Sequence, residues 1–478
     1  MSDLPLMHLI DPTPDAAEAF RRLSALPHCV WLDSAQPLPT LGRYSYLAVD
    51  PVAWHECRPE DAGGWRWLAE AANTHATPAV AGLPPFQGGV AGVLSYELGR
   101  SLERLPTPRF DEFQSPGMAA GLYDVVLAFD HAEGCAWVIS QGLPETEPGA
   151  RRRRAEQRLE QMLGWLEGPA PESDLASAER LAIERLAPQH AVEALPGVAS
   201  DFSRDAYLTA VARVVEYIHA GDAFQVNLSQ RLLHPAGDDP AAAYLSLRER
   251  NPAPFAGYLD LGESRVMSAS PERFLAVRDR RVETRPIKGT RRRSRDATED
   301  RRLADELLAH EKDRAENVMI VDLLRNDLSR VCEAPSVVVP RLCELESYRH
   351  VHHLVSVVEG TLAAGRTPVD LLRASFPGGS ITGAPKVRAM EIIAELEPTA
   401  RGPYCGSLYW LGLGGGMDSS ILIRTLVESR GWVQAPVGGG IVADSDPESE
   451  YEETLHKAAG LIDLASPNAL ANSQQPTT

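Results

Sequence analysis

Short runs of alternating apolar and polar residues, separated by proline and glycine, characterise the first 165 residues. Two stretches, GRYSYLAVD (42–50) and YDVVLAFDHAEGCAWVIS (123–140), have the period-two pattern and the flanking turn residues of β-strands. The arginine-rich stretch 151–168 then changes to a helical period. One face of that helix carries Leu159, Met162, Leu163 and Leu166. These patterns predict a strand-rich N-terminal region, residues 1–165, that ends in a helix.

The C-terminal part of the chain combines helical and strand patterns in succession. An amphipathic helix that ends near Gly221, followed by a strand, fits residues 205–233. Pro385 and Pro447 stand at the predicted starts of two helices, where a missing N–H costs little. Further helices are predicted within 315–333, 379–397 and 447–463, and strands at 349–362, 420–428 and 432–446. Strands in succession with helices between them predict an α+β fold.

The domain boundaries follow from composition. Residues 166–200 are rich in proline and alanine and are predicted to link the N-terminal region to a catalytic region at 201–465. Residues 466–478 lack apolar side chains to bury, which predicts a disordered tail. There is no internal repeat, and 478 residues suit one large or two ordinary domains.

Charge and cysteine usage narrow the class of protein. A net charge of −19 argues against nucleic acid as a partner, because phosphate binding needs a basic surface. The 6 cysteines are scattered without a CxxC pair, which argues against a zinc site and a disulfide framework. The N-terminus lacks the basic and apolar segments of a signal peptide, and no apolar run approaches the roughly 20 residues that span a bilayer. We therefore expect a cytoplasmic protein without a membrane partner.

Two predicted helices each carry acidic residues three positions apart, Asp313 with Glu316 and Glu450 with Glu453. Each pair lies on one helix face. If the two helices face each other, four carboxylates converge, and hard oxygen ligands of this kind favour Mg²⁺. The alternative is that both pairs face solvent, as most acidic helix pairs do. The glycine-rich stretches FPGGSITGAPK and VGGGIVADSD lack nucleotide-binding spacing and fit either small-anion contacts or tight turns.

Nine motifs occur together between residues 205 and 463. In chain order they are AFQVNLSQR, SASPERF, RPIKGTRRR, DRAENVMIVDLLRNDLSRV, HHLVSVVEG, FPGGSITGAPKVRAMEII, YCGSLYWLG, ILIRT and GGGIVADSDPESEYEETLHKA. This series resembles the chorismate-binding family, which includes anthranilate, aminodeoxychorismate, isochorismate and salicylate synthases. The resemblance implies an α/β sandwich of paired antiparallel sheets flanked by helices, with a Mg²⁺-dependent chorismate site.

The resemblance assigns roles to individual residues. Glu316 and Glu453 match direct metal ligands, and Asp313 and Glu450 match supporting acids. The residues that match the substrate site are Arg424 and Tyr409 for the enolpyruvyl carboxylate, Lys457, Gly439 and Gly440 for an anion pocket, and His353 and Thr382 near the ring. Because chorismate is a dianion, one carboxylate can bind the metal while cationic and N–H donors bind the other.

Two further positions bear on the reaction. Glu272 matches the family's general acid, which protonates the departing ring hydroxyl, a poor leaving group. Isochorismate and salicylate synthases activate water with a lysine at the place that Gln225 occupies here. Since glutamine is no base, the sequence disfavours those reactions.

Lys288, in PIKGT, distinguishes between the two kinds of family member that remain, the anthranilate synthases and the aminodeoxychorismate synthases. Anthranilate synthases typically have alanine there, whereas PIKGT resembles the aminodeoxychorismate synthases. Four neighbouring arginines are predicted to disfavour the charged form of this amine and leave it nucleophilic. The predicted reaction is attack by Lys288 on carbon 2, loss of the hydroxyl from carbon 4, and entry of ammonia at carbon 4. The alternatives are an anthranilate-forming enzyme of the tryptophan pathway and, for the lysine, a plain surface position. The arginines concerned are Arg285, Arg291, Arg292 and Arg293.

The resemblance also implies partners. Ammonia is expected from a separate glutamine amidotransferase (glutaminase) subunit, and the product, 4-amino-4-deoxychorismate, would precede p-aminobenzoate and folate. A catalytically silent subunit that regulates a glutaminase is the alternative from another class. The stretch WLDSA lies where relatives bind tryptophan, which makes Ser34 a candidate regulatory residue. Asp33 replaces the glutamate that is usual before this serine.

Overall fold

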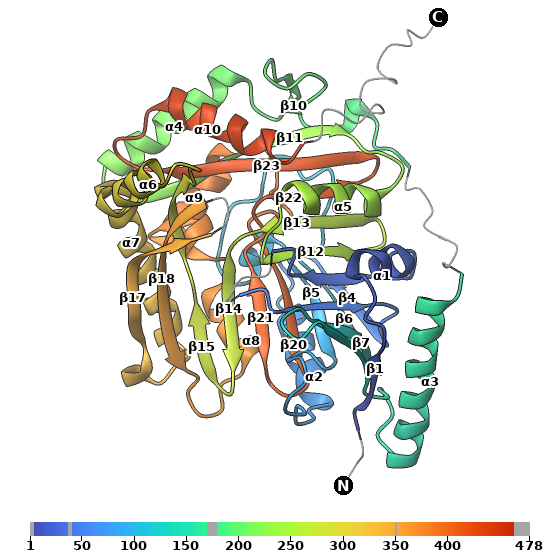
Figure 1. The fold of residues 1–478 in the computed structure, drawn as a ribbon. Coiled ribbons are helices and arrows are strands. Elements are labelled where there is room, and N and C mark those ends of the chain that lie inside the picture. The colour runs from blue at the N-terminus through green and yellow to red at the C-terminus, as the bar shows by residue number, and fades with distance from the viewer. Residues whose placement is uncertain (1–3, 37–40, 170–178, 349–350, 463–478) are drawn as a thin grey trace, which may run out of the picture.

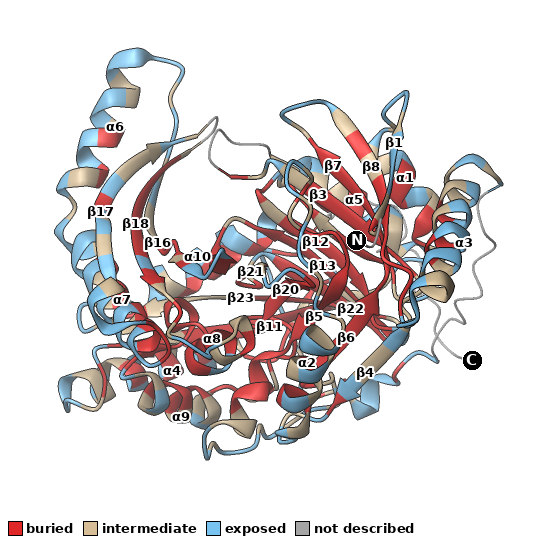
Figure 2. Ribbon diagram, turned by 90° about the horizontal axis from the view of Figure 1, so that it is seen from below, coloured by how far each residue is buried: buried red, intermediate tan, exposed pale blue. Residues whose placement is uncertain are grey.

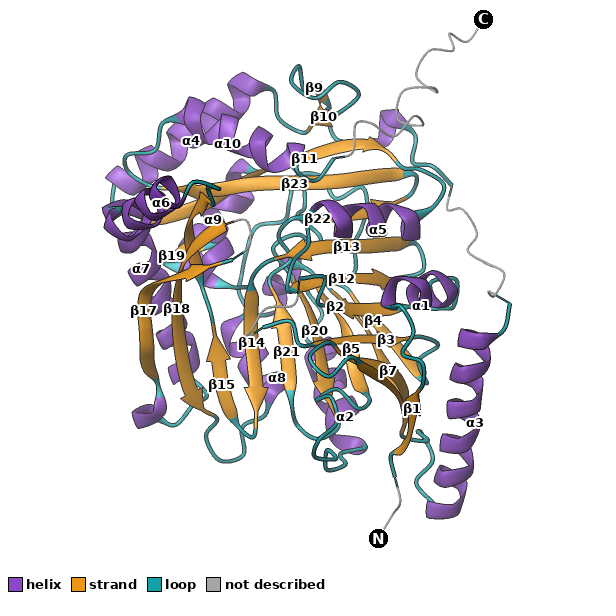
Figure 3. Cartoon of the chain, viewed as in Figure 1, coloured by secondary structure: helices purple, strands orange, loops and turns teal. Residues whose placement is uncertain are grey.

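The computed structural model describes residues 4–36, 41–169, 179–348 and 351–462. Two antiparallel β-sheets form its centre, and helices cover their outer faces (Figure 1; Figure 3). Strands of the first sheet run across the direction of those in the second (Figure 1). The faces of the two sheets are buried where the sheets meet (Figure 2). The predicted α+β fold with paired antiparallel sheets is therefore confirmed.

The first sheet contains the long strands that border the site. Its strands, in spatial order, are β1 (Leu6–Ile10), β8 (Cys135–Ser140), β7 (Val125–Asp130), β3 (Tyr44–Ala48), β2 (Val30–Asp33), β12 (Phe255–Asp260), β13 (Ser264–Ser270), β22 (Thr425–Ser429), β23 (Trp432–Ile441), β11 (Gln225–Pro235), β10 (Ala199–Ser200) and β9 (His190–Ala191), with β19 (Gly383–Ala384) against β11. The pairing of β11 with β23 sets Asn227 opposite Gly440 and Leu228 opposite Gly439.

The second sheet carries the motif with Lys288. Its strands, in spatial order, are β16 (Ile287–Arg292), β18 (Val351–Thr361), β15 (Arg281–Thr284), β14 (Arg273–Arg278), β21 (Met417–Ser420), β20 (Ser407–Gly412), β5 (Gly89–Leu94), β6 (Met118–Tyr123) and β4 (Ala53–Cys57), with β17 (Val338–Ser347) against β18. Strand β18 is almost continuously buried, because β15, β16 and β17 pair with it and α7 packs on it.

The helices begin where the sequence supplies capping groups. Ser203 and Asp446 accept hydrogen bonds from the backbone N–H groups of Ala206 and Ser449, which caps α4 and α10. The helices are α1 (Ala16–Leu23), α2 (Gly63–Thr74), α3 (Pro148–Glu167), α4 (Arg204–His219), α5 (Pro240–Arg250), α6 (Ala297–Ala309), α7 (Glu311–Ser329), α8 (Pro368–Ser375), α9 (Lys386–Leu396) and α10 (Pro447–Ala459). Short 3₁₀ turns are η1 (Tyr96–Ser101), η2 (Ile183–Arg185), η3 (Ala334–Ser336) and η4 (Gly379–Ile381).

Strands from both predicted regions share each sheet. In the first sheet β2 pairs with β12, where Trp31 lies opposite Tyr258, and in the second sheet β5 pairs with β20, where Gly92 lies opposite Tyr409. The N-terminal region is thus part of the same core as the catalytic region. Their exact boundaries stay a prediction, and the predicted tail lies outside the described residues.

One buried arginine fastens α3 to the first sheet. The Arg158 side chain is 2% exposed, and its guanidinium donates to Asp124 Oδ1 at 3.0 Å and Asp50 Oδ2 at 2.7 Å. Burial raises the pKa of Asp124 even though Arg158 lies beside it. The carboxylate of Asp124 therefore depends on this partner, because an isolated buried charge is costly.

We expect Arg158→Ala to lower the free energy of unfolding by about 3–5 kcal/mol, since Asp124 would stay buried without its partner. Urea unfolding followed by circular dichroism measures the change. Arg152→Ala is the matched control, because Arg152 is exposed on the same helix and pairs with Glu156 one turn away, and it should change stability by under about 1 kcal/mol. Equal losses in the two variants would contradict the assignment.

Candidate active site

A cavity of about 570 Å³ lies between the two sheets, beside α7 and α10. This volume is typical of a small-molecule site. The predicted site residues that line it are Glu272, Lys288, Asp313, Glu316, His353, Arg424, Gly439, Gly440, Glu450, Glu453 and Lys457. The fold thus brings together most residues that were named from scattered motifs.

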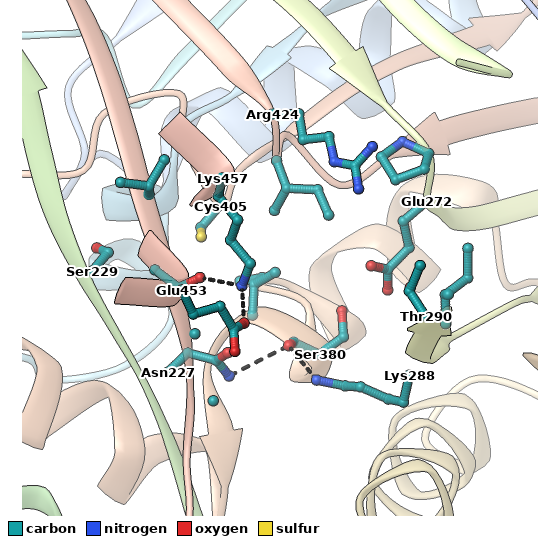
Figure 4. A pocket seen from close by; sticks show the side chains of 18 of the residues that line it. Asn227, Ser229, Glu272, Lys288, Thr290, Ser380, Cys405, Arg424, Glu453 and Lys457 are labelled. Atoms are coloured by element: carbon teal, nitrogen blue, oxygen red, sulfur yellow. Dashed lines mark hydrogen bonds and ion pairs between the residues drawn. The ribbon is translucent and has the colours of Figure 1, made fainter. Parts of the chain in front are cut away.

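Lys288 enters the cavity from the start of β16. The register of β16 against β18 shifts between Lys288 and Thr290, where Gly289 has a φ of 77°. A Cβ on Gly289 would lie 2.9 Å from Cγ of Asp313, so glycine also permits the close approach of α7. The Lys288 ammonium lies 2.6 Å from Oε1 of Glu316. It also lies 3.4 Å from the carbonyl oxygen of Ser380, a contact that Figure 4 shows as a dashed line. It faces the cavity interior and not bulk solvent.

Three of the four arginines near Lys288 in the sequence have carboxylate partners, and their predicted effect on its amine stays a prediction. Arg285 binds Glu346, Arg291 binds Glu306 and Arg293 binds Asp300, so each positive charge has its own carboxylate. These acids come from α6 and β17, which the linear sequence cannot place beside β16. The nearest charged partner of Lys288 is the carboxylate of Glu316.

Glu272 lies in the turn between β13 and β14, and its side chain points into the cavity near Lys288 (Figure 4). The residue is only 6% exposed. Burial raises the pKa of Glu272 to about 7, although the charge of Lys288 and a hydrogen bond from Ser380 oppose the rise. A carboxyl group of this kind holds a proton near neutral pH, as a general acid requires.

Of the two acids on α7, Glu316 accepts hydrogen bonds from two neighbouring donors, whereas Oδ2 of Asp313 has no hydrogen-bond partner among the described residues. Oε1 of Glu316 accepts hydrogen bonds from Lys288 and from Nε2 of Gln225 at 2.7 Å. Burial alone would raise the pKa of Glu316, but the charge of Lys288 and these hydrogen bonds lower it. Asp313 lies 3.0 Å from Nδ1 of His310 and 3.6 Å from Arg291.

The acids of α10 approach the glycines of β23. A Cβ on Gly439 would lie 3.3 Å from Glu450 Oε2 and 3.6 Å from Glu453 Oε1, so the side chains pass directly over the backbone. Lys457 pairs with Glu453 at 2.6 Å and donates to the carbonyl oxygen of Gly438 (Figure 4). Burial, and to a lesser extent the charge of Glu453, raises the pKa of Glu450.

The four acids line one cavity, but the described residues include no group of three or more His, Cys, Asp or Glu side chains already arranged to hold a metal. The predicted convergence is thus incomplete. The donor set still fits Mg²⁺, because carboxylate oxygens of Glu316, Glu450 and Glu453 all approach the open backbone of Gly439 and Gly440. Rotation of the side chains is needed to bring the ligands together.

Arg424 occupies a loop where a strand was predicted. The expected strand at 420–428 begins only at Thr425, and Arg424 has a φ of 51° that turns its side chain into the cavity. Arg424 is an exposed residue whose side chain borders the cavity, and partial desolvation of the guanidinium by neighbouring protein lowers its pKa. Within the described chain no carboxylate forms an ion pair with it, which leaves it available for an anion.

His353 on β18 is held as a neutral ring. Burial and the nearby charge of Arg424 lower its pKa to about 4, and Oγ1 of Thr290 lies 2.9 Å from Nδ1. The imidazole can therefore act in hydrogen bonding near neutral pH without adding charge.

Three predicted residues do not line the cavity. Tyr409 is fully buried in the core on β20 and is not among the lining residues, and its role at the enolpyruvyl carboxylate stays a prediction. The Thr382 hydroxyl donates to the carbonyl oxygen of Gly378, and its assignment beside the ring stays a prediction. Gln225 is buried and reaches the site only through Glu316.

Several cavity residues were missed from the sequence. Ser380 accepts from Lys288 and Asn227 through its carbonyl oxygen, and it lies within the quoted motif FPGGSITGAPK, which was a usable signal. Arg401 donates to Glu397 and to the carbonyl oxygen of Asn227, and so ties α9 to β11. A single arginine outside any motif core offers no comparable signal.

Ser34 lies in a second cavity, of about 220 Å³, away from Lys288. Its neighbour Asp33 is buried and accepts from Arg248 at 2.6 Å and from the Tyr244 hydroxyl at 3.1 Å. Both oxygens of Asp33 are thereby engaged within the protein. The regulatory role of Ser34 stays a prediction.

Sequence relatives of known name carry two different activities. An anthranilate synthase component 1 from Thermus thermophilus is 47% identical over 80% of this chain and 78% of its own. An aminodeoxychorismate synthase component 1 from Escherichia coli is 43% identical over 79% of this chain and 77% of its own. One of the same name from Salmonella typhimurium is 38% identical over 96% of this chain and 99% of its own. Identity alone thus does not separate the two reactions.

Solved structures support the fold. Anthranilate synthase component I from Streptococcus pneumoniae superposes with a TM-score of 0.75 at 32% identity, over 89% of this chain and 93% of that one. A menaquinone-specific isochorismate synthase from Escherichia coli gives 0.69 at 19% identity, over 96% and 94%, which shows the shared fold alone. No helix in the described ranges is long and apolar enough to cross a membrane. The family profile described as chorismate binding enzyme matches residues 27–463, and the chain belongs to this family of chorismate-utilising enzymes.

Proposed function

We propose that the protein converts chorismate and ammonia into 4-amino-4-deoxychorismate. The observation that carries this proposal is the position of Lys288, whose ammonium lies in the cavity beside the buried acid Glu272. An amine and a protonated carboxyl group together supply the nucleophile and the general acid that a two-step substitution requires. We propose the cytoplasm as its location and folate synthesis as its pathway.

The substrate would be held by charge complementarity. Arg424 offers a bidentate donor to the enolpyruvyl carboxylate, and Lys457 with the backbone of Gly439 and Gly440 offers further anion contacts. Glu316 and Glu453 would hold Mg²⁺, with Asp313 and Glu450 in support. When bound, the ion would neutralise a substrate carboxylate and these acids at once.

The proposed substitution proceeds in two balanced steps. The free amine of Lys288 bonds to ring carbon 2, the two ring double bonds shift, and the carbon 4 hydroxyl leaves as water with the proton of Glu272. Ammonia then bonds to carbon 4, the double bonds shift back, and the bond between carbon 2 and Lys288 breaks. Glu272 recovers its proton from the new ammonium group. The net change is loss of water and gain of an amino group para to the ring carboxylate.

Ammonia is proposed to come from a partner glutaminase. The relatives are named component 1, which supports a separate subunit for glutamine hydrolysis. Free ammonium salts should substitute for that subunit in solution.

The second candidate is anthranilate formation, favoured by the 47% identity to a relative of that name. A product assay separates the two. Purified protein is incubated with chorismate, Mg²⁺ and ammonium, with and without a lyase that releases p-aminobenzoate. We expect p-aminobenzoate only with the lyase. Fluorescent anthranilate formed without it would reject the proposal.

A further inference from the structure

One oxygen of Glu316 binds two donors at once. Lys288 and Gln225 both approach Oε1, at 2.6 Å and 2.7 Å, and the side chains of Lys288 and Glu316 are only 13% and 17% exposed. Such a half-enclosed ion pair is stronger than one on the surface. Any other cation that binds this oxygen must displace Lys288.

Lysine is scarce in this chain, which makes its placement informative. Of 47 basic residues only Lys288, Lys312, Lys386 and Lys457 are lysines, and all except Lys386 line the cavity. Arginine fills nearly every other basic position. An ammonium on a flexible stem can change partners more readily than a guanidinium fixed by planar contacts.

We propose that Lys288 and the divalent cation bind Glu316 alternately, so that cation binding releases Lys288 toward the substrate. The inference rests on the proposed function, which makes Glu316 a metal ligand and Lys288 the nucleophile. A divalent ion and an ammonium on the same carboxylate oxygen repel each other, so the two states exclude one another.

The released side chain has a place to go. Lys288 already lies 3.4 Å from the carbonyl oxygen of Ser380, which lines the cavity next to Glu272. A small rotation away from Glu316 keeps the ammonium within the cavity. Once the released ammonium has lost a proton to water, the free amine would be offered to the substrate only when the cation that helps to hold that substrate is present.

Linkage makes the proposal measurable without turnover. If the ion pair between Lys288 and Glu316 weakens cation binding, the cation weakens that ion pair by the same factor. Removing the Lys288 amine must therefore strengthen cation binding. We would titrate the full chain with Mn²⁺, without chorismate, and follow free Mn²⁺ by electron paramagnetic resonance. Lys288→Met, which keeps an unbranched side chain only one atom shorter and removes the charge, should lower the Kd by about 5- to 50-fold.

Two controls complete the experiment. Arg292→Met removes one positive charge from the same strand. Arg292 is exposed and does not line the cavity. Because charges exposed to solvent are screened, this variant should leave the Kd for Mn²⁺ within about twofold of the wild-type value. Glu316→Gln should weaken binding strongly. An unchanged or higher Kd in Lys288→Met, an equal effect of Arg292→Met, or unaltered binding in Glu316→Gln would each overturn the proposal.

The result of the Mn²⁺ titration does not depend on which product the wild-type protein forms. If Lys288→Met binds Mn²⁺ more tightly but the wild-type protein forms anthranilate, the competition between Lys288 and the cation is supported and the proposed function is rejected. A wild-type protein that makes 4-amino-4-deoxychorismate while Lys288→Met binds Mn²⁺ no better would do the reverse. Lys288→Ala should act in the same direction, which guards against an effect peculiar to methionine.

Discussion

Lys288→Ala is expected to lower the rate of 4-amino-4-deoxychorismate formation by at least about a thousandfold, because the variant lacks the amine that makes the first bond. The cavity should stay intact, since within the described part of the chain the Lys288 side chain bonds to Glu316 and Ser380 alone. Any remaining turnover should yield anthranilate, because the smaller side chain leaves room for ammonia at carbon 2. Product analysis by liquid chromatography with ammonium as nitrogen donor measures both effects.

Arg292→Ala serves as the matched control for Lys288→Ala, since it shortens an exposed basic residue on the same strand, β16. It should retain nearly full activity. Thermal unfolding of both variants checks that the fold survives. Unchanged turnover in Lys288→Ala would show that the covalent route is wrong even where the product is as proposed.

Glu272→Gln is expected to lower kcat/KM by about 10²- to 10⁴-fold, because glutamine cannot give a proton to the departing hydroxyl. Burial raises the pKa of Glu272 to about 7, so the wild-type acid is protonated below that pH and loses its proton above it. Activity should therefore fall about tenfold per pH unit above pH 7. The pH profile of kcat/KM in ammonium-dependent turnover tests this.

Glu97→Gln is the matched control for Glu272→Gln. Burial raises the pKa of Glu97 to about 7 as well, but Glu97 accepts from the backbone N–H groups of Arg401 and Gly402 and does not line the cavity. Its variant should keep the decline above pH 7. A decline that vanishes in Glu97→Gln, or that persists in Glu272→Gln, would contradict the assignment of the acid.

Local pattern was sufficient to predict several of the elements that border the cavity in the catalytic region. The helices α4, α7 and α10 and the strands β11, β18 and β23 lie where apolar period and capping residues place them. The exception is Arg424, where β-branched and apolar neighbours indicated a continuous strand. Its left-handed backbone conformation, with a φ of 51°, falls before the start of β22, and no local pattern encodes it.

The site was predictable as a set of residues but not as a set of contacts. The motif series brought Lys288, Glu272 and the four acids together, and the cavity contains all of them. The partners of charged groups depend on elements distant in sequence, so the carboxylates that bind the arginines near Lys288 could not be foreseen. Tyr409 shows the same limit, since strand alternation alone does not say which face of β20 meets the cavity.

The central claim, a temporary bond between Lys288 and the substrate ring, can be tested by mass spectrometry. The protein is mixed with chorismate and Mg²⁺ without ammonia, quenched and digested. We expect the peptide with Lys288 to gain the mass of chorismate less one water, and added ammonium to remove this adduct as product appears. Product formed at full rate while that peptide stays unmodified at every time would contradict this claim.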